Sequence, residues 1–309
     1  MTTAHATTHP TPDDSPNALH QWLQAAQQRH AEQAADVAQG LLQRAAMLPA
    51  DAVGADAIRL AEHVCLAHLA DAALLHRLLQ ALPEHLAGHP ATQARVQRAG
   101  WAQALVAGHP PPEPLPDDAG CWGSLHNVAL AMAGLARCAQ AEALMAQHES
   151  AALAQGSSPA GRAFAASCHN VAMELRGGPR GDAARDALML GAAARARRAW
   201  GHVGGWLQQE RADYELALCH AALGAAEGAA ALVHAQACLA TCEAHAADAM
   251  ERFFAHEALA RAHHARGDAA ALAHQRATMQ ALLPEITEAD GTRAWCAQAL
   301  ADLPPPPGP

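Results

Sequence analysis

Residues 125–129 read LHNVA, and nearly the same string, CHNVA, returns at residues 168–172. The histidines of the two strings, His126 and His169, are 43 residues apart. A string that recurs with a single change indicates that the chain contains a structural repeat. Equivalent positions of two stacked units project from the same side of the stack, so we expect both strings on one face.

A second pair of segments has the same spacing. LALCHAALG at residues 216–224 and LARAHHARG at residues 259–267 match at five of nine positions, and their first residues are again 43 apart. A period of about 20–50 residues is typical of stacked supersecondary units, none of which buries its apolar face alone. The spacing therefore predicts an array of hairpins that pack side by side.

The composition favours helices over strands. Hydrophobic residues make up 51% of the 309 residues, much of this is alanine, and isoleucine occurs only at Ile58 and Ile286. Ala and Leu have the lowest cost in a helix, whereas strands favour β-branched and aromatic side chains. Together with the repeat, the composition predicts an all-α protein built as an α-α superhelix of antiparallel helix hairpins.

The repeat units share a Leu-small pair, a glycine at the turn and, in one unit, a small residue soon after it. These residues are Leu216-Ala217, Gly224 and Ala229 in one unit, and Leu259-Ala260 and Gly267 in the next. Over roughly residues 121–283 the chain resembles a degenerate tetratricopeptide-repeat (TPR) array with units longer than the usual ~34 residues. The resemblance implies that the first helix of each hairpin lines a concave groove. The chain departs from the family at Leu272, where a small residue is usual, and at His220 and His263, where the family has tyrosine.

The chain is divided by a proline-rich stretch and bounded by polar ends. Residues 1–16 and 303–309 lack helical periodicity, which predicts disordered termini. Residues 17–107 predict N-terminal helical hairpins, and residues 108–120, GHPPPEPLPDDAG, predict a linker. The TPR-like repeats are expected over residues 121–302.

The repeated His-Asn pair is the first candidate binding site. His126, Asn127, His169 and Asn170 recur at the repeat spacing, which predicts a polar ladder along the inner helices. An Asn amide both donates and accepts a hydrogen bond, so it can hold the backbone of an extended peptide. The alternative is structural, with these groups tying one repeat to the next, because buried polar groups normally find protein partners.

Aromatic and arginine side chains extend this candidate groove. Trp206, Arg211 and Tyr214 lie in the third repeat, and Trp, Tyr and Arg dominate the energetics of protein interfaces. A groove lined by Arg and Trp selects acidic groups or a C-terminal carboxylate on a partner. The alternative is that the aromatic rings are core residues, as most buried tryptophans are.

A metal site is not predicted, although three residues are weak candidates for one. His234, Cys238 and Cys242 step by four along one expected helix, and imidazole with thiolate suits zinc or copper(I). At about 1.5 Å per residue, no more than two neighbours on one helix reach the same ion. A second helix, carrying His220 or His263, would have to supply the remaining ligands.

The sequence predicts a protein–protein interaction scaffold that binds a peptide or a partner helix in its concave groove. A formal net charge of -10 without a basic run disfavours nucleic acid, and the absence of lysine excludes a Schiff-base amine and the G-x-x-x-x-G-K-[ST] phosphate loop. No cofactor, membrane span or catalytic motif is predicted, and eight scattered cysteines indicate reduced thiols in the cytoplasm. The alternative functions are a His/Cys metal- or cofactor-handling accessory protein and, less favoured, an enzyme on a helical scaffold.

Overall fold

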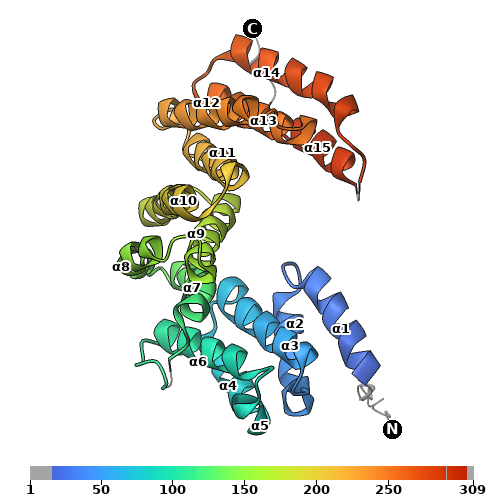
Figure 1. Ribbon diagram of the computed structural model, residues 1–309, viewed down its shortest axis with the longest axis vertical. Helices are drawn as coiled ribbons and strands as arrows, with labels where there is room; N and C mark the ends of the chain where they lie inside the picture. The colour runs from blue at the N-terminus through green and yellow to red at the C-terminus, as the bar shows by residue number, and fades with distance from the viewer. Residues whose placement is uncertain (1–15, 114, 290, 305–309) are drawn as a thin grey trace, which may run out of the picture.

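The computed structural model describes residues 16–113, 115–289 and 291–304, and these residues form fifteen α-helices and no strand (Figure 1). The predicted all-α fold is confirmed. None of the helices in these ranges has both the length and the hydropathy to cross a bilayer. The predicted disordered ends lie outside the described residues except for Pro16, which begins the first helix, and for Leu303 and Pro304, of which Leu303 is buried.

The chain before the proline-rich segment forms short helices. They are α1 (Pro16–Arg29), α2 (Ala34–Arg44), the 3-10 turn η1 (Ala45–Met47), α3 (Ala52–His63), the π-helical turn η2 (Val64–His68), α4 (Ala72–Gln80), α5 (His85–Gly88) and α6 (Gln93–Ala107). Helices α3 and α4 pack on α6, and both α6 and η2 pack on the first repeat helix. One apolar cluster runs from Leu23 to Cys219, so these helices and the first repeats share a core.

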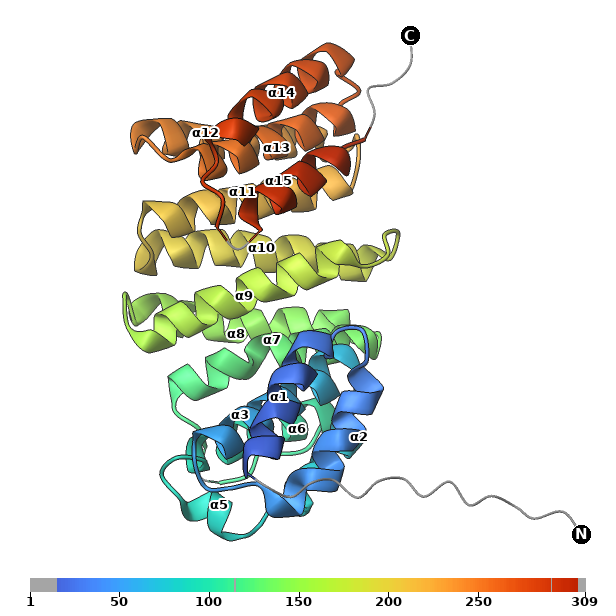
Figure 2. The ribbon, with the colours of Figure 1, turned by 90° about the vertical axis from the view of Figure 1, so that its right-hand side faces the viewer.

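The rest of the chain alternates between two layers. Its helices are α7 (Asp118–Gly134), α8 (Cys138–Ala154), α9 (Pro159–Gly177), α10 (Ala183–Val203), α11 (Trp206–Ala222), α12 (Gly228–Ala244), α13 (Ala249–Ala265), α14 (Ala269–Leu282), η3 (Leu283–Glu285) and α15 (Thr292–Ala301). Helices α7, α9, α11 and α13 pack on one another in that order, and α8 packs on α10. The stack curves into an arc with α7, α9, α11 and α13 on its inner side (Figure 1). Figure 2 looks into the open side of the arc, where α1 and α15 stand below and above α9.

Capping residues explain where these helices begin and end. Side chains at seven N-caps accept hydrogen bonds from first-turn amides: Asp51, Asp71, Asp117, Ser158, Asp182, Asp248 and Asp268. Each cap satisfies an amide that has no partner inside the helix. Gly224 and Gly267 follow α11 and α13 with φ of +79° and +74°, a left-handed conformation that favours glycine. The two turns occupy equivalent places in successive hairpins, as the 43-residue spacing predicts.

The proline-rich linker is shorter than its predicted range of 108–120. Asp117 accepts a hydrogen bond from the amide of Gly120 (2.6 Å), so α7 begins at Asp118 and takes over the last residues of that range. An aspartate N-cap explains the early start, because it stabilises the first turn without an apolar side chain. The linker also contacts the helices, since a Cβ on Gly100 of α6 would lie 3.4 Å from Pro112.

Candidate functional site: the inner face of the array

Two cavities open where the inner helices meet their neighbours. The first, about 470 Å³, lies between α1, α3, α6, α7 and α9, and its walls include Arg59, His63, Arg98, His126, Asn127 and Asn170. The second, about 220 Å³, lies between α9, α11, α13 and the end of α15, and its walls include Arg176, Leu218, Arg261, His264 and Pro304. Helix α9 lines both cavities and therefore connects them.

Asn127 is fully engaged inside the protein. Its side-chain oxygen accepts a hydrogen bond from Nδ1 of His63 (2.9 Å), and its Nδ2 donates to Oε1 of Glu62 (2.7 Å). Glu62 and Asn127 are 3% and 4% exposed, so water does not compete for these bonds. The geometry favours the structural alternative for Asn127, which ties α3 to α7.

His126 lies beside this network as a half-buried, neutral ring. Its ring centroid is 5.8 Å from that of His63. Burial, with smaller contributions from the nearby His63 and Arg98, lowers the pKa of His126 to about 4. Near neutral pH this side chain therefore offers the first cavity an uncharged imidazole.

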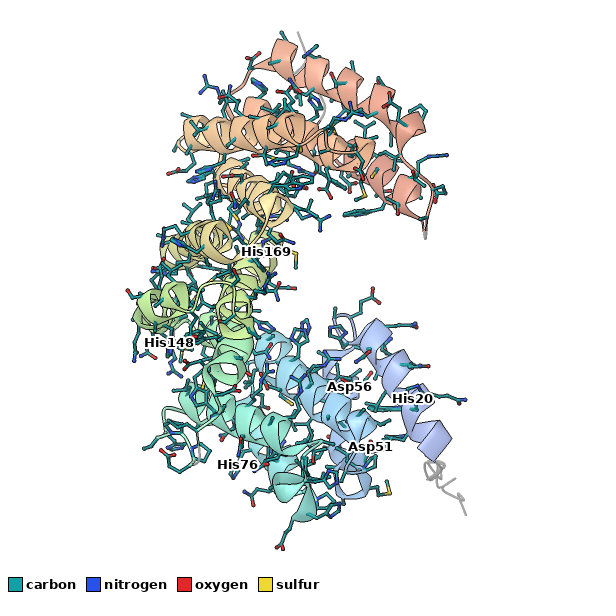
Figure 3. The ribbon with its side chains drawn as sticks, in the orientation of Figure 1. His20, Asp51, Asp56, His76, His148 and His169 are labelled. Atoms are coloured by element: carbon teal, nitrogen blue, oxygen red, sulfur yellow. The ribbon has the colours of Figure 1, made fainter. Side chains whose placement is uncertain are left out.

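His169 and Asn170 occupy the equivalent places on α9 but have different surroundings. Figure 3 shows His169 toward the open side of the arc and His148 on the outer side. Burial lowers the pKa of His169; Glu215 opposes the shift, and Arg176 and Arg211 add to it. The amide of Asn170 lines the first cavity and has no hydrogen-bond partner among the described residues. Of the two predicted amides, Asn170 is thus the one that is free to bind a ligand.

Carboxylates link the inner helices of the array to one another. Arg176 of α9 donates to Glu215 of α11 from Nε (2.7 Å) and Nη2 (3.1 Å). Two bonds join α11 to α13 in the same way: Arg211 pairs with Glu251, and the Tyr214 hydroxyl donates to Glu257 (2.9 Å). Burial and the nearby Glu257 raise the pKa of the Tyr214 phenol, which keeps it a donor. The predicted groove residues Arg211 and Tyr214 are therefore ties between repeats.

Trp206 lies away from both cavities. Its ring stacks on His245 with a centroid separation of 4.9 Å and an interplanar angle of 9°. It also packs against a small buried cluster that contains Cys238 and Cys242. This half-buried position favours the core alternative for Trp206.

The structure separates the three weak metal candidates. His234 bonds through Nδ1 to Asp213 (3.1 Å) and stacks on His220 at 5.7 Å. Cys238 instead donates its thiol hydrogen to Oε1 of Glu210 (2.8 Å). Cys242 lies 3.7 Å from the same oxygen. His234 and the two thiols thus have different partners, and burial raises the pKa of Glu210 to about 7.

The sequence analysis missed a cluster of His30, His63 and His68, of which the first two lie on the wall of the first cavity. It depends on η2, in which the amide of Leu69 donates to the carbonyl of Val64, five residues earlier (3.1 Å). In an α-helix residues five apart point about 140° away from each other, whereas a π-turn places them one above the other. Nε2 of His63 and Nε2 of His68 are consequently 3.2 Å apart. The unusual turn, more than any spacing motif, creates the cluster.

Arginine gives the two cavities a common chemistry. Arg98 in the first donates to the Ser124 hydroxyl (3.2 Å) and forms no ion pair among the described residues. Arg176 and Arg261 in the second are paired with carboxylates along one edge. Guanidinium groups beside a free amide suit an anionic, hydrogen-bonding ligand. No family model, no curated protein and no solved structure matches this chain.

Proposed function

We propose that this protein is an interaction scaffold that holds an extended acidic segment of a partner protein along α9, on the inner face of the array. The observation that carries the proposal is that α9 connects two cavities, each with arginine in its wall. Arg98 supports the assignment of an acidic partner because its guanidinium has no carboxylate partner among the described residues. A carboxylate would supply that partner through charge-assisted hydrogen bonds.

The spacing along α9 suggests the shape of the ligand. Asn170 and Arg176 are six residues apart, which corresponds to about 9 Å along a helix axis. Three residues of a polyproline II segment span about the same length and bring side chains to the same side. Met173, 41% exposed, lies between them in the sequence and offers an apolar contact. We infer an extended partner segment whose contacts with Asn170 and with Arg176 lie about three residues apart, and which carries an acidic side chain for Arg98.

Asn170 fits the same ligand. Its amide has a free donor and a free acceptor, which are the two groups needed to hold the N–H and C=O of an extended backbone. The proposed TPR relationship agrees with this use, since the first helices of the hairpins line the groove in that family. Asn127 has no such role in the proposal, because Glu62 and His63 occupy its amide.

Peptide binding measured by fluorescence anisotropy tests the proposal. Labelled peptides would carry two acidic residues separated by two, three or four positions. The control for each would be the same peptide with both acidic residues replaced by lysine. We expect the best acidic peptide to bind at least tenfold more tightly to the wild type than to Arg98→Gln. A charge-assisted bond contributes about 1.5–3 kcal/mol, which is a factor of about 10–100 in affinity.

The matched control is Arg162→Gln, an exposed arginine at the first turn of the same helix and outside both cavities. Its affinity should equal that of the wild type, whereas Asn170→Ala should weaken binding. Equal affinity for acidic and lysine-substituted peptides would contradict the proposal. So would unchanged affinity in both Arg98→Gln and Asn170→Ala.

A further inference from the structure

Three histidines from separate segments converge at the edge of the first cavity. His30 follows α1, His63 ends α3, and His68 ends η2. One ring nitrogen from each lies within 4.8 Å of the others. Ring centroids are 5.2 Å apart for His30 with either partner and 4.7 Å apart for His63 with His68. Such convergence of half-buried imidazoles is the arrangement of a metal site with three protein ligands.

Hydrogen bonds fix which nitrogen of two rings is available. Nδ1 of His30 lies 2.6 Å from the carbonyl oxygen of Gln27, and a carbonyl only accepts, so Nδ1 carries the hydrogen. Nδ1 of His63 donates to the oxygen of Asn127, because Glu62 holds the amide with its nitrogen toward the carboxylate. Nε2 of both rings therefore has a free lone pair. Metal-ligating histidines are oriented by outer partners of this kind.

The remaining distances suit a small first-row ion. Two nitrogen ligands about 2.0–2.1 Å from a tetrahedral ion lie roughly 3.3 Å from each other. Nε2 of His63 and Nε2 of His68 are already 3.2 Å apart. Without an ion, Nε2–H of His68 donates to the Nε2 lone pair of His63. On metal binding, His68 would lose this hydrogen to solvent and take one up on Nδ1, which leaves the Nε2 lone pair for the ion. One ring nitrogen of His30 lies within 4.8 Å of a nitrogen of each of the other two, so a movement of the His30 ring toward them would complete the set.

The electrostatic surroundings permit a cation. Imidazole binds a metal ion through an unprotonated ring nitrogen, and Nε2 of His63 is such a nitrogen because Nδ1 carries the hydrogen donated to Asn127. The Glu62 carboxylate, joined to His63 through Asn127, adds negative charge behind the ligands.

We propose that His30, His63 and His68 bind one Zn²⁺ ion whose fourth position opens toward the first cavity. Three imidazoles favour zinc and similar borderline ions over magnesium or calcium, which take oxygen ligands. The ion would fasten α1 to α3, which share a small contact, and among residues 18–29 of α1 only Leu23 and Ala26 are buried. This inference is independent of the proposed peptide binding, because the ligands and the measurement differ.

Zinc binding by untagged, metal-free full-length protein tests the site. Competition of ZnCl₂ with a chromophoric chelator should give one tight ion per chain for the wild type. Each of His30→Gln and His68→Gln should weaken that affinity by at least a hundredfold. Asn127→Ala, which frees Nδ1 of His63, should weaken it by about 10–100-fold, as the loss of an outer partner does. His63→Gln is less useful, since it also breaks the bond to Asn127.

Controls separate this site from weak binding by other histidines. His20→Gln and His76→Gln replace exposed histidines on α1 and α4, and Arg98→Gln alters the first cavity without removing a ligand. All three should bind zinc as the wild type does. Saturating Zn²⁺ should also slow proteolytic cleavage within α1 in the wild type and leave the rate unchanged in His68→Gln. The proposal would be overturned if both His30→Gln and His68→Gln bound zinc with wild-type affinity. It would also be overturned if the wild type bound no zinc ion tightly.

Discussion

The junction between α3 and α7 and the array from α9 to α13 join their helices by different polar chemistry. In the array, arginine or tyrosine on one inner helix bonds to a glutamate on the next, as in Arg176 with Glu215. At the junction the bonds are His63 to Asn127 and Asn127 to Glu62, and no ion pair connects the two helices among the described residues. Arginine stays charged at all relevant pH values, whereas imidazole responds to protons and metals. The comparison shows inner helices of the array that are tied by arginine and tyrosine, and a junction that is tied by an imidazole able to bind protons or a metal.

The largest effect is expected from breaking a tie of the array. Arg176→Met leaves the Glu215 carboxylate, 4% exposed, without its bidentate partner. Loss of one partner of a buried ion pair costs about 3–5 kcal/mol. We expect the free energy of unfolding, measured by urea denaturation, to fall by that amount.

The double variant Arg176→Met with Glu215→Leu serves as the control for this tie. It removes the buried charge together with its partner and should recover much of the lost stability, since apolar replacement of a whole buried pair is often neutral. Arg162→Met on the exposed face of α9 should change stability by no more than about 0.5 kcal/mol. Equal losses in the single and double variants would show that the ion pair is not what holds α9 to α11.

The sequence predicted the array from α9 to α13 better than the junction between α3 and α7. The 43-residue spacing predicted the hairpins and the glycine turns at Gly224 and Gly267, because those features are local and repeat with the chain. The different fates of Asn127 and Asn170 could not be predicted, since the partners of Asn127 lie 64 and 65 residues away in a segment without the repeat.

The histidine cluster was hidden for a similar reason. His63 and His68 point apart on a regular α-helix, and only the π-turn, which has no clear sequence signature here, brings them together. His30 comes from another segment altogether. His234, Cys238 and Cys242 do step by four along α12, but the neighbouring helix α11 supplies Asp213 to the histidine and Glu210 to the thiols. Spacing predicts a shared face, and the packing partner decides what that face does.

Glu210 differs from the other buried glutamates of the array because its partners are the thiols of Cys238 and Cys242 instead of arginine or tyrosine. Burial raises its pKa to about 7, so the folded state holds a proton that the unfolded chain, with a pKa of 4.5, has released. Stability should therefore fall as pH rises from about 4.5 to 7, by on the order of 3 kcal/mol. Comparing the free energy of unfolding of the wild type with that of Glu210→Gln at pH 5 and pH 7.5 measures this contribution. Relative to the wild type, Glu210→Gln should have a higher free energy of unfolding at pH 7.5 than at pH 5. A difference between the two proteins that does not change with pH would refute the raised pKa of Glu210.

The smallest effect is expected when the stability loss of Asn127→Ala is compared with that of Asn170→Ala at the equivalent repeat position. Asn127→Ala leaves Oε1 of Glu62 and Nδ1 of His63 unsatisfied in the interior, which should cost about 1–3 kcal/mol. Asn170→Ala removes an amide that has no partner among the described residues, so its cost should stay within about 0.5 kcal/mol. Both substitutions replace Asn by Ala on an inner helix, so the change in helix propensity is the same and cancels in the comparison. The difference between the two unfolding free energies then reports the junction network together with the deeper burial of Asn127. If both variants lost the same stability, the junction would be held by apolar packing alone, and the contrast with the array would disappear.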